Sequence, residues 1–375
     1  MLLTALLLAG LIALLCILTA CALHSQFGAL PEEAEIRRFQ TLPNYSNGQF
    51  HNLESVHMNV KKLARKPGFF RFLLDSSNAP ESELPAVRLT RNSFASKPGE
   101  FNVTWLGHSM LIVELAGRRF LTDPVFGNAA PVPFVVRRYC DSPLPREELP
   151  PLDFILISHD HYDHLEYATI RFFRNSDVPF VVPLGVGAIL RGWGIAPERI
   201  RELNWNDSIM LNEIRITALT NRHFSGRRLG NRNRTLWASF LFEGGGKKIY
   251  FGADGGYGKH FREIGTRYGT FDLTGLEIDA WNERWPHNHL FPDEVIQAQM
   301  DLRGKRLLPI HWGVFDLAMH PWDESIGKVR SLAEQKRLLL LTPKMGERIQ
   351  PESARTTPWW TSPAPRDAEL TKKEN

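Results

Sequence analysis

The side chains best suited to chemistry lie in one heptapeptide, Ser158-His159-Asp160-His161-Tyr162-Asp163-His164. It directly follows residues 154–157, a short, continuous apolar run that predicts a buried strand. Imidazole and carboxylate groups together suit Zn²⁺ or a similar first-row metal ion. A polar loop without a metal is the alternative, but a strand that ends directly in such a cluster favours the metal site. The candidate ligands are His159, His161, Asp163 and His164.

Three further candidate ligands follow apolar strands in the same way. His223 ends residues 214–222, Asp254 comes after residues 248–251, and His311 comes after residues 307–310. Because neighbouring strands end at one edge of a sheet, where ligand sites commonly form, we expect these side chains to converge on the heptapeptide. Taken singly, His223 or His311 is more typical of a hydrogen-bonded structural histidine. The prediction of a metal site therefore depends on the whole set of candidate ligands in this order.

Seven ligands are too many for one ion, so the set predicts two. We assign His159, His161 and His223 to one ion, Asp163, His164 and His311 to the other, and Asp254 to a bridge between them. Each ion then keeps an open position for a shared water. Because two metal ions lower the pKa of such a water and stabilise developing charge, hydrolysis is the expected chemistry.

Two residues upstream are candidates for orienting these ligands. His108 follows Leu106-Gly107, and Asp123 lies in Leu121-Thr122-Asp123-Pro124. Either side chain could form a hydrogen bond to a ligand from outside the metal site. Local turn chemistry is an equally good explanation, particularly for an aspartate that precedes a proline.

Many short strands with later, interleaved helices predict two sheets flanked by helices. The predicted strands span residues 101–106, 110–115, 119–122, 154–158, 180–183, 213–219, 237–242, 248–251, 273–277, 307–310 and 338–341. The predicted helices span residues 165–173, 186–193, 292–302 and 322–335, the third opening on Pro292 with an acidic first turn.

The ends of the chain have a different character. Residues 1–23 carry no charge, which indicates either a secretory signal or a membrane anchor. Residues 18–21 read Leu-Thr-Ala-Cys and resemble a bacterial lipobox that would make Cys21 the lipidated first residue, although no basic residue precedes the run. Residues 24–100 are expected to be irregular, residues 101–350 to form the catalytic domain, and residues 351–375 to form a loosely packed tail.

Composition limits the partners. The chain has 375 residues, 43% of them hydrophobic, and a net charge of +4 without a Lys/Arg block, so nucleic acid is not an expected partner. A basic patch beside aromatic residues predicts either a solvated segment or a surface that touches a bilayer. Its members are Lys61, Lys62, Arg65, Lys66, Phe69, Phe70 and Phe72. If Cys21 is lipidated, Cys140 is the one remaining thiol and no intrachain disulfide forms.

The ordered ligand set resembles the metallo-β-lactamase fold, with His159-x-His161-x-Asp163-His164 followed by His223, Asp254 and His311. Over residues 42–350 the chain is also similar to the phospholipase D family that hydrolyses N-acyl-phosphatidylethanolamine. The segments that carry this closer resemblance are residues 103–108 (VTWLGH), 120–124 (FLTDP), 156–164 (LISHDHYDH), 233–237 (NRTLW), 265–269 (GTRYG) and 310–315 (IHWGVF).

That resemblance implies an α/β fold with an αβ/βα sandwich in four layers, two zinc ions per chain, and cleavage of a phosphodiester to phosphatidic acid and an N-acylethanolamine. It also implies that a histidine before a Pro-acid-acid helix start assists the reaction. His289 matches that position, with His287 as its rival. The catalytic residues would then be His289, Asp163 and Asp254. The chain departs from the family at Gly255, where a threonine is more common, and in the segment before residue 101.

The leading hypothesis is therefore a membrane-associated, di-zinc phosphodiesterase that acts on N-acylated glycerophospholipids. Its partners would be the phospholipid and the membrane surface, with the catalytic domain outside the cytoplasm, and the family suggests a homodimer. A lactonase or other ester hydrolase on the same metal centre is the alternative. A non-enzymatic zinc protein is less favoured, because structural zinc sites are closed and this ligand set leaves water positions.

Overall fold

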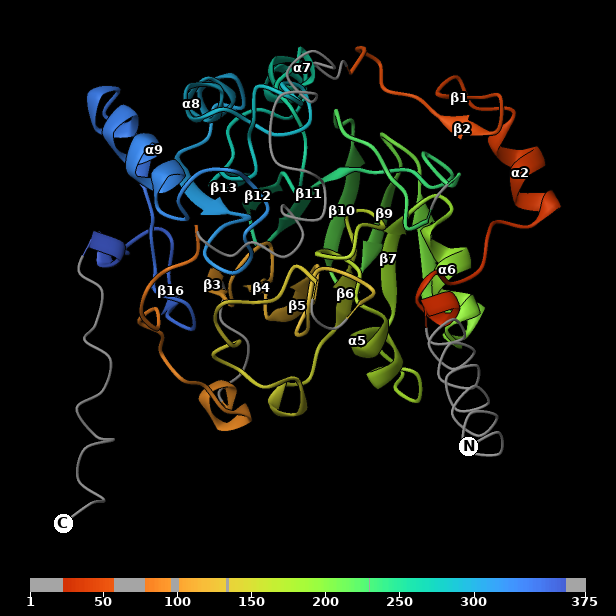
Figure 1. Cartoon of the computed structure of the whole chain (residues 1–375), viewed down its shortest axis with the longest axis horizontal. Coiled ribbons are helices and arrows are strands. Elements are labelled where there is room, and N and C mark those ends of the chain that lie inside the picture. The colour runs from red at the N-terminus through yellow and green to blue at the C-terminus, as the bar shows by residue number, and fades with distance from the viewer. Residues whose placement is uncertain (1–22, 57–77, 96–100, 133–134, 229, 362–375) are drawn as a thin grey trace, which may run out of the picture.

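A computed structural model of the chain describes residues 23–56, 78–95, 101–132, 135–228 and 230–361. Two seven-stranded sheets pack face to face, and helices cover their outer sides (Figure 1). This is the αβ/βα sandwich that the sequence predicted, and the α/β prediction is confirmed.

The first sheet has the order β16-β3-β4-β5-β6-β7-β8. Its antiparallel half, β3 to β5, joins a parallel half in which β5, β6, β7 and β8 all run the same way. Since β6 is buried along its whole length, it holds the start of the heptapeptide firmly. The strands are β3 (Phe101–Trp105), β4 (Leu111–Leu115), β5 (Arg118–Thr122), β6 (Phe154–Leu156), β7 (Phe180–Pro183), β8 (Ile200–Leu203) and β16 (Arg348–Ile349).

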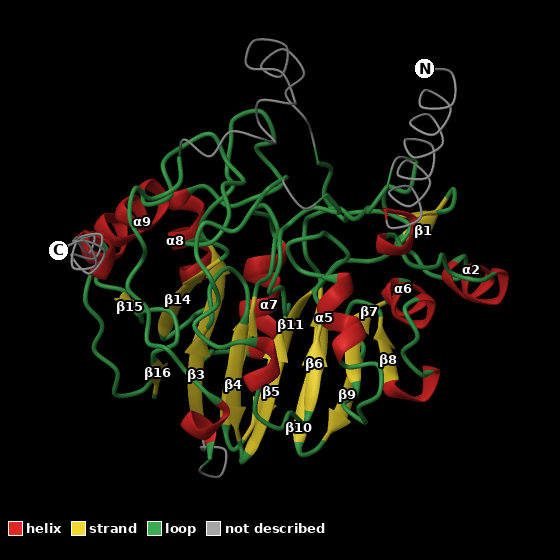
Figure 2. Cartoon of the chain, turned by 60° about the horizontal axis from the view of Figure 1, so that its bottom comes forward, coloured by secondary structure: helices red, strands yellow, loops and turns green. Residues whose placement is uncertain are grey.

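The second sheet has the order β15-β14-β13-β12-β11-β10-β9. Strands β12, β13, β14 and β15 are parallel, so the loops that follow them leave from the same edge. The strands are β9 (Ser208–Leu211), β10 (Ile214–Leu219), β11 (Ser239–Gly244), β12 (Lys247–Phe251), β13 (Leu273–Glu277), β14 (Arg306–Ile310) and β15 (Leu339–Leu340). Figure 2 shows the strands with the helices and loops around them.

Aromatic side chains join the two sheets. Phe120 of the first sheet lies with its ring centroid 4.5 Å from that of Phe242 in the second, and 4.5 Å from that of Phe154. All three are fully buried. Burial of this kind stabilises a fold by about 25 cal/mol per Å² of apolar surface, so these contacts fix the distance between the two edges that carry the site.

Helices α5 (Tyr167–Phe172) and α6 (Val186–Gly192) lie on the side of the first sheet, and α7 (His260–Tyr268), α8 (Pro292–Asp301) and α9 (Glu324–Gln335) on the side of the second (Figure 1). The sequence predicted all of these except α7. A glycine inside that helix, Gly265, concealed it, because glycine weakens helices. The structure explains the glycine, since a Cβ there would lie 1.9 Å from the carbonyl oxygen of Asp301 in α8.

The prediction of a loosely packed tail is wrong for Trp359 and Trp360. Trp359 and Trp360 are buried, and the ring of Trp359 stacks on Trp312 with centroids 5.3 Å apart. Trp312 stacks in turn on Trp105 at 5.2 Å. A stack of large rings buries more apolar surface than the proline- and charge-rich sequence of the tail suggested.

The described parts of the segment before the catalytic domain, residues 24–56 and 78–95, are also more ordered than expected. They include α2 (Glu33–Phe39) and a hairpin of β1 (Tyr45–Ser46) and β2 (Gln49–Phe50). Phe39, Tyr45 and Phe50 pack together with ring centroids 4.8–5.6 Å apart and join the main core. These apolar anchors attach the segment to the catalytic domain.

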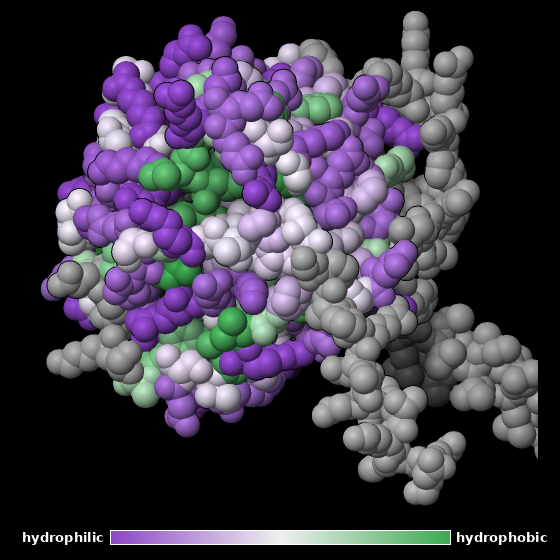
Figure 3. Space-filling view, turned by 90° about the vertical axis from the view of Figure 1, so that its left-hand side faces the viewer, coloured by the Kyte–Doolittle hydropathy of each residue, from purple (hydrophilic) through white to green (hydrophobic). Residues whose placement is uncertain are grey.

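The predicted N-terminal signal or anchor spans residues 1–23, of which residues 1–22 lie outside the described residues. The basic aromatic patch lies within residues 57–77, which are also outside them. Among the described helices, none has the length and apolar character needed to cross a bilayer. The described surface around α8, α9 and β15 is mostly hydrophilic, with separate apolar patches (Figure 3). Met300 and Leu339 are among its exposed apolar residues.

Candidate metal centre

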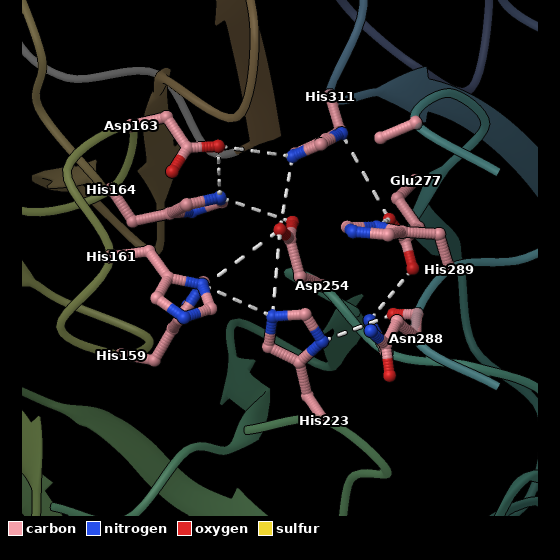
Figure 4. A network of polar contacts seen from close by, with 12 residues as sticks. His159, His161, Asp163, His164, His223, Asp254, Glu277, Asn288, His289 and His311 are labelled. Atoms are coloured by element: carbon pink, nitrogen blue, oxygen red, sulfur yellow. Dashed lines mark hydrogen bonds and ion pairs between the residues drawn. The ribbon is translucent and has the colours of Figure 1, made fainter. Parts of the chain in front are cut away.

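Three ring nitrogens meet at the end of β6. Nε2 of His159 lies 2.8 Å from Nδ1 of His161, which lies 3.3 Å from Nε2 of His223. His159 and His161 come from the loop after β6, whereas His223 follows β10 in the other sheet. The sandwich therefore brings together the first predicted ligand set (Figure 4).

The second predicted set lies beside the first. Oδ2 of Asp163 is 3.4 Å from Nε2 of both His164 and His311. His311 follows β14 and has a left-handed backbone, with φ of 65°. That conformation is unusual for a residue other than glycine, and it turns the side chain back toward the other sheet.

Asp254 lies between the two sets. Its Oδ1 is 3.1 Å from Nε2 of His164, and its Oδ2 is 3.0 Å from Nε2 of His311. Oδ2 is also 4.0 Å from Nε2 of His159 and 3.9 Å from Nε2 of His223. All seven predicted ligands thus converge, and Asp254 occupies the position expected of the bridge.

Asp123 orients ligands from both sets. Its Oδ2 accepts a hydrogen bond from Nδ1 of His164 at 2.8 Å and one from the Ser158 hydroxyl at 2.6 Å. The same hydroxyl lies 2.9 Å from Nδ1 of His159. With Nδ1 engaged, both histidines turn Nε2 toward the centre, as expected for metal-binding imidazoles.

His108 has the predicted orienting contact, because its Nε2 lies 3.1 Å from Oδ2 of Asp163. Burial, followed by the charge of His311, lowers the pKa of His108 to about 3. Nε2 of a neutral His108 can therefore donate to Asp163 and direct that carboxylate.

His223 is held by residues that the sequence reasoning missed. Its Nδ1 lies 3.0 Å from the carbonyl oxygen of Asn288. The side chain of Asn52 accepts a hydrogen bond from the His223 backbone N–H at 3.0 Å and donates to the His223 carbonyl at 2.6 Å. Asn52 belongs to the segment before the catalytic domain, and its sequence surroundings gave no signal of this contact.

His289 lies beside the centre, next to another residue that was not predicted, Glu277. Oε2 of Glu277 is 2.6 Å from Nδ1 of His289, and Oε1 accepts a hydrogen bond from the Gly255 backbone N–H at 2.7 Å. Glu277 ends β13, so it occupies the same strand-end position that identified Asp254 and His311. A Cβ at Gly255 would lie 1.9 Å from Oδ1 of Asn221, which explains a glycine where the similar family more often has threonine.

The two ligand sets differ in the direction of their histidine pKa shifts. Burial and neighbouring imidazoles lower the pKa of His159 and His223 well below the usual histidine value, so both stay neutral. Burial also lowers the pKa of His311, but the charge of Asp254 and the close approach of Nε2 to both carboxylates outweigh it and raise the pKa to about 10. His164 is raised well above the usual pKa in the same way. The carboxylates therefore attract positive charge.

The unpaired atoms also fit a metal. Nε2 of His164, both ring nitrogens of His311 and Oδ1 of Asp254 are buried without a hydrogen-bond partner. In each of the two sets, candidate ligand atoms lie within 4.8 Å of one another. Ligands 2.0–2.2 Å from a tetrahedral zinc ion are about 3.4 Å apart, so the observed spacings suit such an ion. Asp163, His161 and His289 are partly exposed, and the centre is open to solvent on their side.

Comparison with known proteins agrees with this site. Residues 118–312 match the beta-lactamase superfamily domain. An uncharacterized protein of Mycobacterium tuberculosis is 39% identical over 348 residues, covering 90% of this chain and 93% of that protein. An N-acyl-phosphatidylethanolamine-hydrolyzing phospholipase D of Caenorhabditis elegans is 31% identical over 308 residues, covering 77% of this chain and 86% of that protein.

Solved structures support the fold. An isothiocyanate hydrolase from Delia radicum gut bacteria aligns with a TM-score of 0.54 at 19% identity, covering 66% of this chain and 98% of that one. A metallo hydrolase from Ignicoccus hospitalis aligns with a TM-score of 0.52 at 19% identity, covering 66% of this chain and 97% of that one. The chain thus belongs to the metallo-β-lactamase superfamily and is a metal-dependent hydrolase related to phospholipases D that hydrolyse N-acyl-phosphatidylethanolamine.

Proposed function

We propose that the chain is a di-zinc phosphodiesterase of the phospholipase D type, which converts N-acyl-phosphatidylethanolamine or a similar glycerophospholipid to phosphatidic acid and an N-acylethanolamine. The observation that carries the proposal is the pair of three-ligand sets that share Asp254, with His289 beside them. The relatives named for this activity support the choice of substrate.

Each residue of the centre has a definite part in this reaction. Two bound zinc ions would lower the pKa of a water and neutralise charge on the phosphate. Asp254 and Asp163 supply the negative charge that retains them. The neutral imidazoles of the first set would bind one zinc ion; they belong to His159, His161 and His223. Asp123 and Ser158 fix the ring orientation of His159 and His164.

His289 is the remaining group that can touch substrate. Burial lowers its pKa, but the charge of Glu277 and their hydrogen bond raise it above the usual histidine value, so His289 favours its charged form. A charged imidazole can hold a phosphate oxygen or give a proton to the leaving alkoxide. Its ring lies 5.3 Å from that of the candidate ligand His311, which places His289 directly beside the proposed metal site.

We also propose that the protein works at a membrane. The uncharged residues 1–23 would tether the chain, as a lipoprotein through Cys21 or as an uncleaved anchor, with the catalytic domain outside the cytoplasm. Intact mass of the mature protein distinguishes the two, because a diacylated Cys21 supports processing and a retained Met1 excludes it. A homodimer is proposed on family resemblance and is tested by sedimentation.

The activity test uses purified full-length protein with N-acyl-phosphatidylethanolamine in mixed micelles. We expect release of phosphatidic acid and about two zinc ions per chain, as in other two-metal sites. Asp254→Asn should lose metal and activity together, whereas the matched change at the half-buried Asp153, Asp153→Asn, should lose neither. Turnover of lactones or other carboxylic esters, with none of the lipid, would exclude this function and favour the ester-hydrolase alternative.

A further inference from the structure

Glu277 is a buried carboxylate that the proposed ligand sets do not use. Its side chain is 1% exposed at the end of β13. One oxygen lies 2.6 Å from Nδ1 of His289, and the other accepts the Gly255 N–H at 2.7 Å. Figure 4 shows Glu277 and His289 on one side of Asp254, with His159, His161 and His164 on the other.

Two simpler explanations fit these contacts less well. Glu277 could itself bind a metal, because its ligand atoms lie within 4.8 Å of those of Asp254, His289 and His311. Both of its oxygens, however, are already engaged as hydrogen-bond acceptors, and Oε2 is 3.9 Å from Nδ1 of His311. Glu277 could also be purely structural, but burying a carboxylate is costly, and an amide could accept the Gly255 bond without a charge.

We propose that Glu277 is the positioning residue of His289, a role that rests on the proposed part of His289 in phosphodiester cleavage. The carboxylate holds Nδ1 as an N–H donor, so Nε2 is the ring atom that remains to meet a phosphate oxygen or the leaving alkoxide. The same arrangement of carboxylate and imidazole fixes ring orientation and tautomer in hydrolases of other folds.

The second contact of Glu277 adds a constraint on distance. Gly255 directly follows Asp254, so its bond to Oε1 ties the loop that carries the bridging carboxylate to the residue that holds His289. A single side chain therefore sets where His289 lies relative to Asp254. Glycine at position 255 allows this close approach, because any side chain there would meet Asn221.

The test is a double-mutant cycle with Glu277→Gln, His289→Asn and the double variant, in the zinc-loaded full-length protein. Substrates are the lipid and bis(p-nitrophenyl) phosphate, and binding of inorganic phosphate provides a readout apart from activity. If Glu277 acts through His289, we expect Glu277→Gln to lower kcat about 10- to 100-fold with little change in KM, as the loss of an orienting partner does. We expect the double variant to be no slower than His289→Asn, and phosphate affinity to follow the same non-additive pattern.

Glu114→Gln is the matched control. Glu114 is an equally buried glutamate, but it pairs with Arg119 and Arg348, away from the centre. Its loss should reduce the free energy of unfolding without changing kcat.

Three results would overturn the inference: additive losses in the cycle, loss of zinc from Glu277→Gln, or an unchanged kcat and phosphate affinity in that variant. Failure of the proposed function is seen separately, as absence of phosphatidic acid release by the wild-type protein. In that case the double-mutant cycle is evaluated from the cleavage of bis(p-nitrophenyl) phosphate and from the affinity for inorganic phosphate. A wild-type protein that releases no phosphatidic acid, does not cleave bis(p-nitrophenyl) phosphate and binds no phosphate overturns both proposals.

Discussion

Replacing Asp123 with asparagine should weaken metal binding without disturbing the backbone. Asparagine has the same shape and tolerates the left-handed conformation at this position, where φ is 39°. Oδ1 of Asp123 accepts the Ser158 N–H at 2.7 Å, and Oδ2 accepts from both the Ser158 hydroxyl and Nδ1 of His164. An amide offers one acceptor oxygen and one donor nitrogen in their place.

The asparagine side chain cannot accept hydrogen bonds from both the Ser158 backbone N–H and Nδ1 of His164. If its oxygen keeps the Ser158 N–H, its NH₂ faces Nδ1 of His164, and the imidazole proton must move to Nε2, where it blocks a metal. If the amide turns round, the Ser158 N–H is left without an acceptor, at a cost of about 1–3 kcal/mol. Loss of an outer partner of a metal ligand typically costs about 10- to 100-fold in affinity, or about 1.4–2.7 kcal/mol.

The measurement is a competition titration of the metal-free protein with zinc and a chromophoric chelator. We expect the site of His164 to weaken by that factor, and the site of His159 to weaken less, because Ser158 lies between Asp123 and His159. Asp153→Asn is the control, since that carboxylate accepts the Arg119 N–H at 2.8 Å but contacts no ligand. An Asp123→Asn protein that folds and binds zinc with wild-type affinity would refute the reasoning.

Three further predictions follow from residues around the centre. Asn52→Ala removes both hydrogen bonds to the His223 backbone, so zinc affinity should fall about 10-fold in the same titration. An unchanged affinity would show that Asn52 does not position His223. Burial, and then the charge of Arg222, lowers the pKa of His260 to about 3. In the unfolded chain His260 takes up a proton below its usual pKa of about 6.5, whereas in the folded protein it stays neutral down to about pH 3. The free energy of unfolding should therefore fall as the pH drops from 7 toward 3, by about 2 kcal/mol at pH 5. His260→Asn should show a correspondingly smaller loss in denaturant titrations at the two pH values, and an equal loss would contradict the assignment. Trp359→Ala should lower the free energy of unfolding by about 3–5 kcal/mol, because it opens a cavity in the tryptophan stack. A loss below about 1 kcal/mol is typical of a surface substitution and would mean that Trp359 is not part of the core in solution.

The strands that deliver ligands were predictable because most of their residues are apolar and a candidate ligand follows within four residues of the strand end. The heptapeptide after β6 and His311 after β14 have this pattern, and the structure places all of the predicted ligands together. Strands β8 and β9 lie toward the far edges of their sheets and have mixed polar sequences, so they were missed. Partial exposure of an edge strand removes the apolar pattern on which such a prediction depends.

Only some of the residues that orient the ligands could be predicted from the sequence. Asp123 and His108 were candidates because each is a polar side chain just after a predicted strand. Asn52 and the Asn288 carbonyl were not, since an asparagine in a loop or a backbone oxygen has no distinctive sequence context. Glu277 lay at the end of a predicted strand, and the strand-end rule that selected Asp254 would also have selected it.

The sequence by itself determined the ligand types, their order, and the strand ends on which they lie, because these depend on local pattern and side-chain chemistry. It did not determine that Trp359 and Trp360 pack into the core, or that Asn52 holds His223 from a position 171 residues away. It also did not pair Glu277 with His289. Those contacts are set when two sheets close on a common core, and their distances depend on packing between segments that no local pattern describes.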